Sequence, residues 1–202
     1  MSTQSDTNSI YRLAGLAAVL SGALQSAYLV INVAFAGGSI GSLPTETGFQ
    51  SLGRILMVAW SLLLIPTAIS LMAWLQRERI LLPLLYSVLG VISLLMWAYA
   101  TATHRLSPTL QASSLLLASV WWMGTGTEMT EQRKLLGAFT FFVGVAALLE
   151  IMVANIEPFG RFTWLGELRL PLVLVWSLWM GFELLLRPPD RQPNNAREPA
   201  TE

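Results

Sequence analysis

Glu150 is the residue whose position points most directly to chemistry. It lies inside an apolar run that extends from residue 145 to residue 154. A carboxylate within a membrane span is costly, so it should face other helices and either find a cation or be protonated. Arg54, at the start of an earlier apolar stretch, is the predicted counter-charge. Three interpretations stay open: a structural Glu150–Arg54 pair, a proton- or cation-binding group, and a side chain that reaches the membrane surface.

Other polar residues fall on helical faces that would pack at a similar depth in the membrane to Glu150. The first apolar stretch places six residues on one face, because they recur in steps of four and three: Ala14, Ala18, Ser21, Gln25, Tyr28 and Asn32. Such a face is either a polar packing seam between helices or one wall of an outward-facing cavity. The residues predicted to form the cavity or ion pair are Glu150, Arg54, Asn32, Gln25, His104 and Asn155.

A second acidic residue has a local explanation. Glu183 precedes Arg187 by four residues near the end of the last apolar stretch. Residues with this spacing are neighbours on a helix surface. We therefore expect a Glu183–Arg187 ion pair at the membrane surface.

The motifs for catalysis are weak. Residues 37–41 match the G-x-S-x-G pattern around Ser39, and His104 is the only possible imidazole base. That pattern marks a nucleophile only where a strand precedes it and a helix follows it, whereas here it follows an apolar helix in a Gly/Ser-rich segment. A flexible loop is therefore favoured over a Ser39–His104 dyad. A metal site of His104 with Glu46, Glu157 or Glu167 is similarly disfavoured.

Composition narrows the chemistry further. The chain has no cysteine and one histidine, which excludes disulfides, thiolate zinc sites, iron–sulfur clusters and bis-histidine haem. Twelve basic residues balance twelve acidic ones, so there is no net positive charge to attract nucleic acid. We therefore expect no catalytic residues, no metal, no cofactor and no nucleic-acid partner.

The hydrophobic pattern predicts the elements that would position these side chains. Of the 202 residues, 54% are hydrophobic and 12% are charged, about half the charged share of a soluble domain. A membrane-spanning helix needs about 20 apolar residues, and six continuous stretches meet or approach that length: 11–36, 52–76, 80–103, 108–124, 135–155 and 168–186. The prediction is an all-α polytopic membrane protein, a bundle of about six transmembrane helices over residues 1–187, with a disordered cytoplasmic tail at 188–202. The first stretch is too long and too polar for a cleaved signal peptide, although Ala34-Phe35-Ala36 resembles a cleavage site.

The basic residues predict an orientation. With six spans both termini share one side, which collects Arg12, Arg77, Arg79, Arg133, Lys134, Arg187, Arg191 and Arg197. The other side collects Arg54, Arg105, Arg161 and Arg169. By the positive-inside rule this distribution favours cytoplasmic termini in a multi-pass cell-membrane protein.

The opening segment from Tyr11 to Gly22 (YRLAGLAAVLSG) resembles the start of small six-helix bacterial integral membrane proteins of unknown function. The resemblance implies a bacterial inner-membrane protein and brings no catalytic residues. Three functions from different classes stay open. The first is a non-enzymatic accessory or structural subunit that packs in the lipid bilayer against a partner or a second copy. The second is a small transporter or sensor with a polar cavity around Glu150, and the third is an intramembrane enzyme that uses Ser39 or the outer carboxylates.

Overall fold

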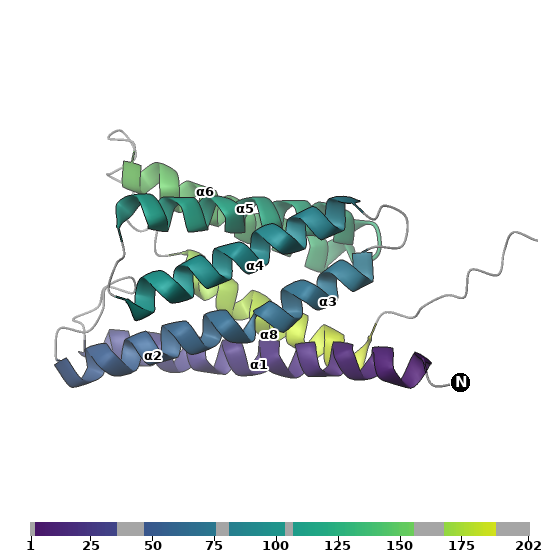
Figure 1. Cartoon of the computed structure of the whole chain (residues 1–202), viewed down its shortest axis with the longest axis horizontal. Helices are drawn as coiled ribbons and strands as arrows, with labels where there is room; N and C mark the ends of the chain where they lie inside the picture. The colour runs from purple at the N-terminus through teal and green to yellow at the C-terminus, as the bar shows by residue number, and fades with distance from the viewer. Residues whose placement is uncertain (1–2, 36–46, 76–80, 104–106, 156–167, 189–202) are drawn as a thin grey trace, which may run out of the picture.

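The computed structural model is all-helical wherever it describes the chain, which is over residues 3–35, 47–75, 81–103, 107–155 and 168–188. Its helices are α1 (Thr3–Phe35), α2 (Thr47–Leu63), α3 (Ile65–Leu75), α4 (Leu81–Ala102), α5 (Pro108–Thr130), α6 (Lys134–Asn155) and α8 (Arg169–Leu186). Figure 1 shows them as a bundle of elongated, roughly antiparallel rods. The predicted all-α class is confirmed.

Within the described residues, five segments are long and apolar enough to cross a membrane: Asn8–Ala34, Gln50–Leu75, Leu81–Ala102, Lys134–Val153 and Arg169–Leu186. They correspond to five of the six predicted stretches. The remaining predicted stretch, 108–124, forms α5, which is 23 residues long but carries several serines and threonines and a glutamate. The helix is therefore present as predicted, but its polar side chains make it less apolar than the five candidate membrane spans.

The α2–α3 junction is a kink within one candidate span. Pro66 is the second residue of α3, and Leu64 between the two helices has its N–H near the carbonyls of both Trp60 and Ser61, at 3.3 and 3.2 Å. Proline has no N–H and its ring displaces the preceding turn, so the helix bends at this point. The chain nevertheless continues in the same direction (Figure 1).

The α5 helix extends six residues beyond the predicted end at Gly124. The Gly124–Thr127 segment reads as a helix break in the sequence, but both of its glycines lie at helix contacts. A Cβ on Gly124 would come within 2.4 Å of the Tyr86 ring, and one on Gly126 within 2.4 Å of the backbone nitrogen of Phe141. These glycines allow neighbouring helices to approach closely, as small residues do in membrane bundles.

Two helix pairs form the closest contacts in the bundle, α5 with α6 and α1 with α8. In the second pair Gly15 faces Gly181: a Cβ on either residue would come within 2.8 Å of the other's carbonyl oxygen. The bundle core contains three tryptophans in mutual contact, Trp121, Trp122 and Trp176, with ring centroids 5.1–5.8 Å apart. The aromatic core therefore joins α5 to α8.

The succession of helices gives the bundle two distinct ends. The start of α1 and the end of α8 lie at one end (right in Figure 1), which we call the terminal end. The opposite end holds the end of α1, the start of α2, the end of α4 and the start of α8, and we call it the distal end. Residues 188–202, predicted to be a tail, lie outside the described residues except for Pro188.

Candidate functional site

The charged group inside the bundle is an ion pair between Glu150 of α6 and Arg169 at the start of α8. The Nε atom of Arg169 donates to Oε2 of Glu150 at 2.5 Å, and Nη2 lies 3.5 Å from Oε1. The side chains are only 5% exposed for Arg169 and 14% for Glu150. The guanidinium thus presents two nitrogens to the two carboxylate oxygens, the geometry in which arginine holds a carboxylate most specifically.

Side chains from two further helices surround the pair. The Arg169 guanidinium carbon lies 5.0 Å from the centre of the Trp97 ring on α4, a cation–π distance. On α1, the side chains of Tyr28 and Asn32 share a hydrogen bond, and Tyr28 lies within electrostatic range of Arg169. We call Tyr28, Asn32, Trp97, Glu150 and Arg169 the distal polar cluster. It joins α1, α4, α6 and α8 near the distal end.

The predicted pairing of Glu150 with Arg54 is wrong. Arg54 lies on α2, which packs on α1, α3 and α4, whereas α6 packs on α5 and α8. The sequence predicts a similar depth in the membrane for Arg54 and Glu150, but their helices do not pack on each other. Arg169 supplies the positive charge instead, because α8 lies beside α6.

The other predicted site residues add nothing to this cluster in the part of the chain that the structure describes. Gln25 is buried, but it belongs to a different contact, donating to Ser21 and Ser177 at 3.3 Å each. Asn155 is the last residue of α6. The remaining residues considered for catalysis or metal binding lie outside the described part of the chain: Ser39, Glu46, His104, Glu157 and Glu167. Of the predicted set, the structure therefore brings Asn32 and Glu150 together in one cluster.

The sequence reasoning missed Arg169 because it treated this residue as a topological marker at the membrane surface. Its signal was present: Arg169 follows Leu168 at the start of an apolar run, in the same layer as Glu150. Tyr28 was predicted on a helix face but not as a neighbour of the ion pair, whose arginine also contacts Trp97. Their helices do not pack directly on each other, since α1 packs on α2, α3 and α8 and α4 packs on α2, α3 and α5. Arg169 is the residue that interacts with both.

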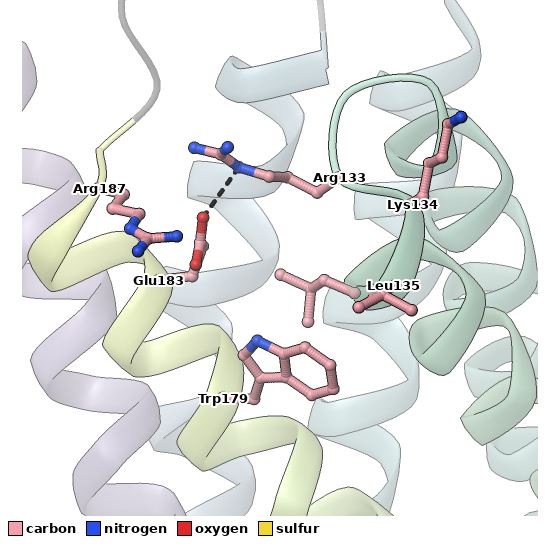
Figure 2. Close-up of a pocket in the computed structure, with 7 residues that line it drawn as sticks. Arg133, Lys134, Leu135, Trp179, Glu183 and Arg187 are labelled. Atoms are coloured by element: carbon pink, nitrogen blue, oxygen red, sulfur yellow. Dashed lines mark ion pairs between the residues drawn. The ribbon is translucent and has the colours of Figure 1, made fainter.

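Among the described residues, the ion pair is one of three polar contacts between α8 and α6 with the turn before it, an interface that we call the α6–α8 seam. In the middle of the seam, the Trp176 indole Nε1 donates to Oγ1 of Thr140 at 2.9 Å. At the terminal end, Nε of Arg133, the residue before α6, lies 2.8 Å from Oε1 of Glu183 (Figure 2). The three α8 residues are seven positions apart, so they share one face of the helix. This face of α8 is held to α6 by polar groups at three levels.

The Glu183 contact corrects a second prediction. The expected i,i+4 partner, Arg187, lies at the end of α8 with φ −137° and ψ 57°, outside the helical region. Its N–H still donates to the Glu183 carbonyl oxygen at 2.8 Å, but the two side chains form no ion pair. Arg133, from the turn that precedes α6, pairs with Glu183 instead.

The predicted face of the first helix is confirmed as a buried face, with all six of its residues almost fully buried. The Ser21 hydroxyl donates to the Trp60 carbonyl oxygen at 3.1 Å, and Gln25 connects α1 to α8 through Ser177. Over this part of α1 the polar groups bond across helix contacts. The packing-seam interpretation therefore fits Ser21 and Gln25, while Tyr28 and Asn32 belong to the distal polar cluster.

Chemically, the cluster holds a carboxylate whose charge is offset by a guanidinium. In the part of the chain that the structure describes, no three His, Cys, Asp or Glu side chains come together to hold a metal ion. The chain matches no protein-family model, no curated protein and no solved structure. The ion pair can therefore hold α6 and α8 together, and breaking it would allow these helices to separate.

Proposed function

We propose that this chain is a non-enzymatic accessory or structural subunit of a bacterial cell membrane, with both termini in the cytoplasm. The observation that supports this most is that both carboxylates along the α6–α8 seam are in ion pairs. Glu150 and Glu183 are each joined to an arginine, Arg169 and Arg133. They connect helices, and neither is an isolated acid or base.

The outer surface of the bundle is suited to lipid and to partner helices. Large apolar side chains are exposed on all the candidate spans, among them Val30 on α1, Leu85 on α4, Phe142 on α6 and Phe182 on α8. In water such a surface would associate, and in a bilayer it contacts acyl chains or another protein. We propose that the partner is a second membrane protein or a second copy of this chain.

Copurification tests the proposal. The tagged full chain is expressed at low level in bacterial membranes, cross-linked in the intact membrane and extracted in a mild detergent. We expect a defined companion or a homo-oligomer that survives extraction. A strictly monomeric chain in both samples would refute the proposal. Reporter fusions at the C-terminus test the orientation separately, and a periplasmic signal would contradict it.

A second function, a sensor or transporter, is supported by one specific observation. Trp97, whose ring lies beside Arg169, has a buried indole nitrogen with no hydrogen-bond partner among the described residues. The same is true of the Oγ1 atom of Thr101, one helical turn later on α4. Buried polar groups without partners often mark a site that takes up water or a ligand. The indole nitrogens of Trp60, Trp121 and Trp122 are in the same state, but none of these three rings forms a cation–π contact within the described ranges. A solute that bonds the Trp97 and Thr101 groups, or a proton on Glu150, would compete with the ion pair.

Glu150→Gln tests this second function, with Glu183→Gln as its matched control. Both replace a carboxylate paired with an arginine on the α6–α8 seam, but only the first lies in the distal polar cluster. Tryptophan fluorescence of the purified protein is followed through a pH titration, with Trp97→Phe used to isolate the Trp97 signal. A sensor predicts a Trp97 transition that Glu150→Gln abolishes and Glu183→Gln retains. A Trp97 signal that is flat in the wild-type protein would leave only the structural pair.

A further inference from the structure

At the terminal end, α6 and α8 diverge around a cavity of about 280 Å³. It is lined by Arg133, Lys134, Leu135, Leu136, Trp179, Glu183 and Arg187. In Figure 2 the guanidinium of Arg133 lies above the Glu183 carboxylate and that of Arg187 lies beside it, while the Lys134 ammonium points away from both. Trp179 lies one helical turn before Glu183 on α8, farther from the terminal end. The cavity therefore has a charged mouth and an apolar floor.

The mouth of the cavity has more basic side chains than acidic ones. Three basic residues and one carboxylate line it, which leaves an excess of two positive charges. Arg133 is paired with Glu183. Neither Lys134 nor Arg187 forms an ion pair within the described ranges. Two cations at the mouth are thus free to bind an anion.

The floor is apolar and open to the outside of the bundle. The side chain of Leu135 is 77% exposed and that of Trp179 is 37% exposed. Trp179 also contacts Phe139, with ring centroids 5.7 Å apart, so the apolar wall continues along α6 toward the middle of the span. A soluble anion would use only the mouth. A molecule with an anionic head and an acyl chain would use both parts.

We propose that this cavity binds the headgroup of an anionic phospholipid, with one acyl chain lying along Trp179 and Phe139. Arg187 contacts the phosphate, Lys134 reaches it by a change of its flexible side-chain rotamer, and Arg133 stays paired with Glu183. Basic side chains between helices at the cytoplasmic side of a membrane are suited to such headgroups. Aromatic side chains such as Trp179 favour the same depth, at the boundary between headgroups and acyl chains.

The test measures lipid binding by the purified full chain. Phosphatidylglycerol and phosphatidylcholine with identical acyl chains are added in detergent, and binding is followed by native mass spectrometry and by the shift in unfolding temperature. Soluble glycerol phosphate forms a third arm. We expect preferential binding and stabilisation by phosphatidylglycerol, with little effect of either of the other two.

The variant Lys134→Gln/Arg187→Gln removes the two unpaired cations and leaves the Arg133–Glu183 pair in place. It should lower the apparent affinity for phosphatidylglycerol by about thirtyfold, since each of the two surface cations contributes roughly 1 kcal/mol and about 1.4 kcal/mol corresponds to a tenfold change. Arg12→Gln is the control, because Arg12 is exposed near the terminal end on α1 but does not line the cavity. It should bind as the wild-type protein does.

Three results would overturn the proposal. The first is equal binding of the two lipids by the wild-type protein, and the second is full phosphatidylglycerol binding by the double variant. The third is equal stabilisation by glycerol phosphate, which would show that the cavity binds a soluble anion. If the double variant does not fold, Arg187→Gln alone is compared with Arg12→Gln by the same two measurements. Undiminished binding by that single variant would also contradict the proposal.

Discussion

Arg169 and Glu150 form a nearly buried ion pair between the first turn of α8 and the last third of α6. Each of these helices packs most closely on a different neighbour, α8 on α1 and α6 on α5. The ion pair therefore joins two helix pairs that are each held internally by close glycine contacts. Removing two charges from water offsets much of their attraction, so a buried pair specifies which groups meet more than it adds net stability.

We predict that Glu150→Leu destabilises the protein strongly. The substitution leaves the Arg169 charge buried without its carboxylate, and losing one partner of a buried pair costs about 3–5 kcal/mol. The free energy of unfolding in detergent, from denaturant titration followed by tryptophan fluorescence, measures the loss.

The control for this prediction is Glu150→Leu/Arg169→Leu. Replacing both charges with apolar side chains is often neutral or stabilising, so the double variant should recover most of the stability that the single variant loses. Equal losses in the two variants would show that the charges are not coupled. The difference between the single and double variants gives their interaction energy.

We predict a further loss of stability when the α5–α6 contact is crowded. A Cβ at Gly126 would lie 2.4 Å from the Phe141 nitrogen and 2.7 Å from the Gly137 carbonyl oxygen, and both are backbone atoms. Gly126→Ala must therefore separate the helices, at a cost of about 1–3 kcal/mol.

Gly22→Ala is the matched control for Gly126→Ala. A Cβ at Gly22 would meet Cδ2 and Cγ of the Leu178 side chain, at 2.7 and 2.8 Å, while the Leu178 backbone nitrogen is 3.5 Å away. A leucine side chain can change its rotamer, and alanine favours a helix over glycine. We expect a clearly smaller change in unfolding temperature than for Gly126→Ala. The reverse order would contradict the close backbone contact at Gly126.

These contacts show what the sequence could and could not predict. The helices follow from continuous apolar runs, and the buried face of the first helix follows from its spacing, because both depend on local periodicity. The partner of Glu150 depends on which helices adjoin, and no local pattern contains that information. The sequence predicts the same depth in the membrane for Arg54 and Arg169. Only the packing of α8 beside α6 shows that Arg169 is the partner of Glu150. The helix end predicted at Gly124 is wrong for a related reason, because glycine both breaks helices and allows close contact between them.

We predict that Thr140→Val weakens the middle of the α6–α8 seam. The Thr140 hydroxyl accepts the hydrogen bond from the Trp176 indole, and Trp176 is fully buried. Valine has nearly the same shape but leaves that N–H without an acceptor, which costs about 1–3 kcal/mol. Thr127→Val is the control, because the Thr127 hydroxyl is exposed and bonds only to the Met123 carbonyl in its own helix. Equal effects of the two substitutions on unfolding would contradict the role of the cross-helix bond.

We predict that Gln25→Leu has little effect, although Gln25 is as deeply buried as Thr140. The Gln25 amide nitrogen donates to the hydroxyls of Ser21 and Ser177. Those hydroxyls in turn donate to the backbone carbonyls of Trp60 and Val173, so both keep their own acceptors when the amide is removed. The substitution also removes a buried Oε1 atom that has no hydrogen-bond partner among the described residues. Because no donor is orphaned, unfolding stability should change by less than about 1 kcal/mol. A loss as large as that of Thr140→Val would mean that the Gln25 amide supports the α1–α8 contact in a way its own hydrogen bonds do not account for.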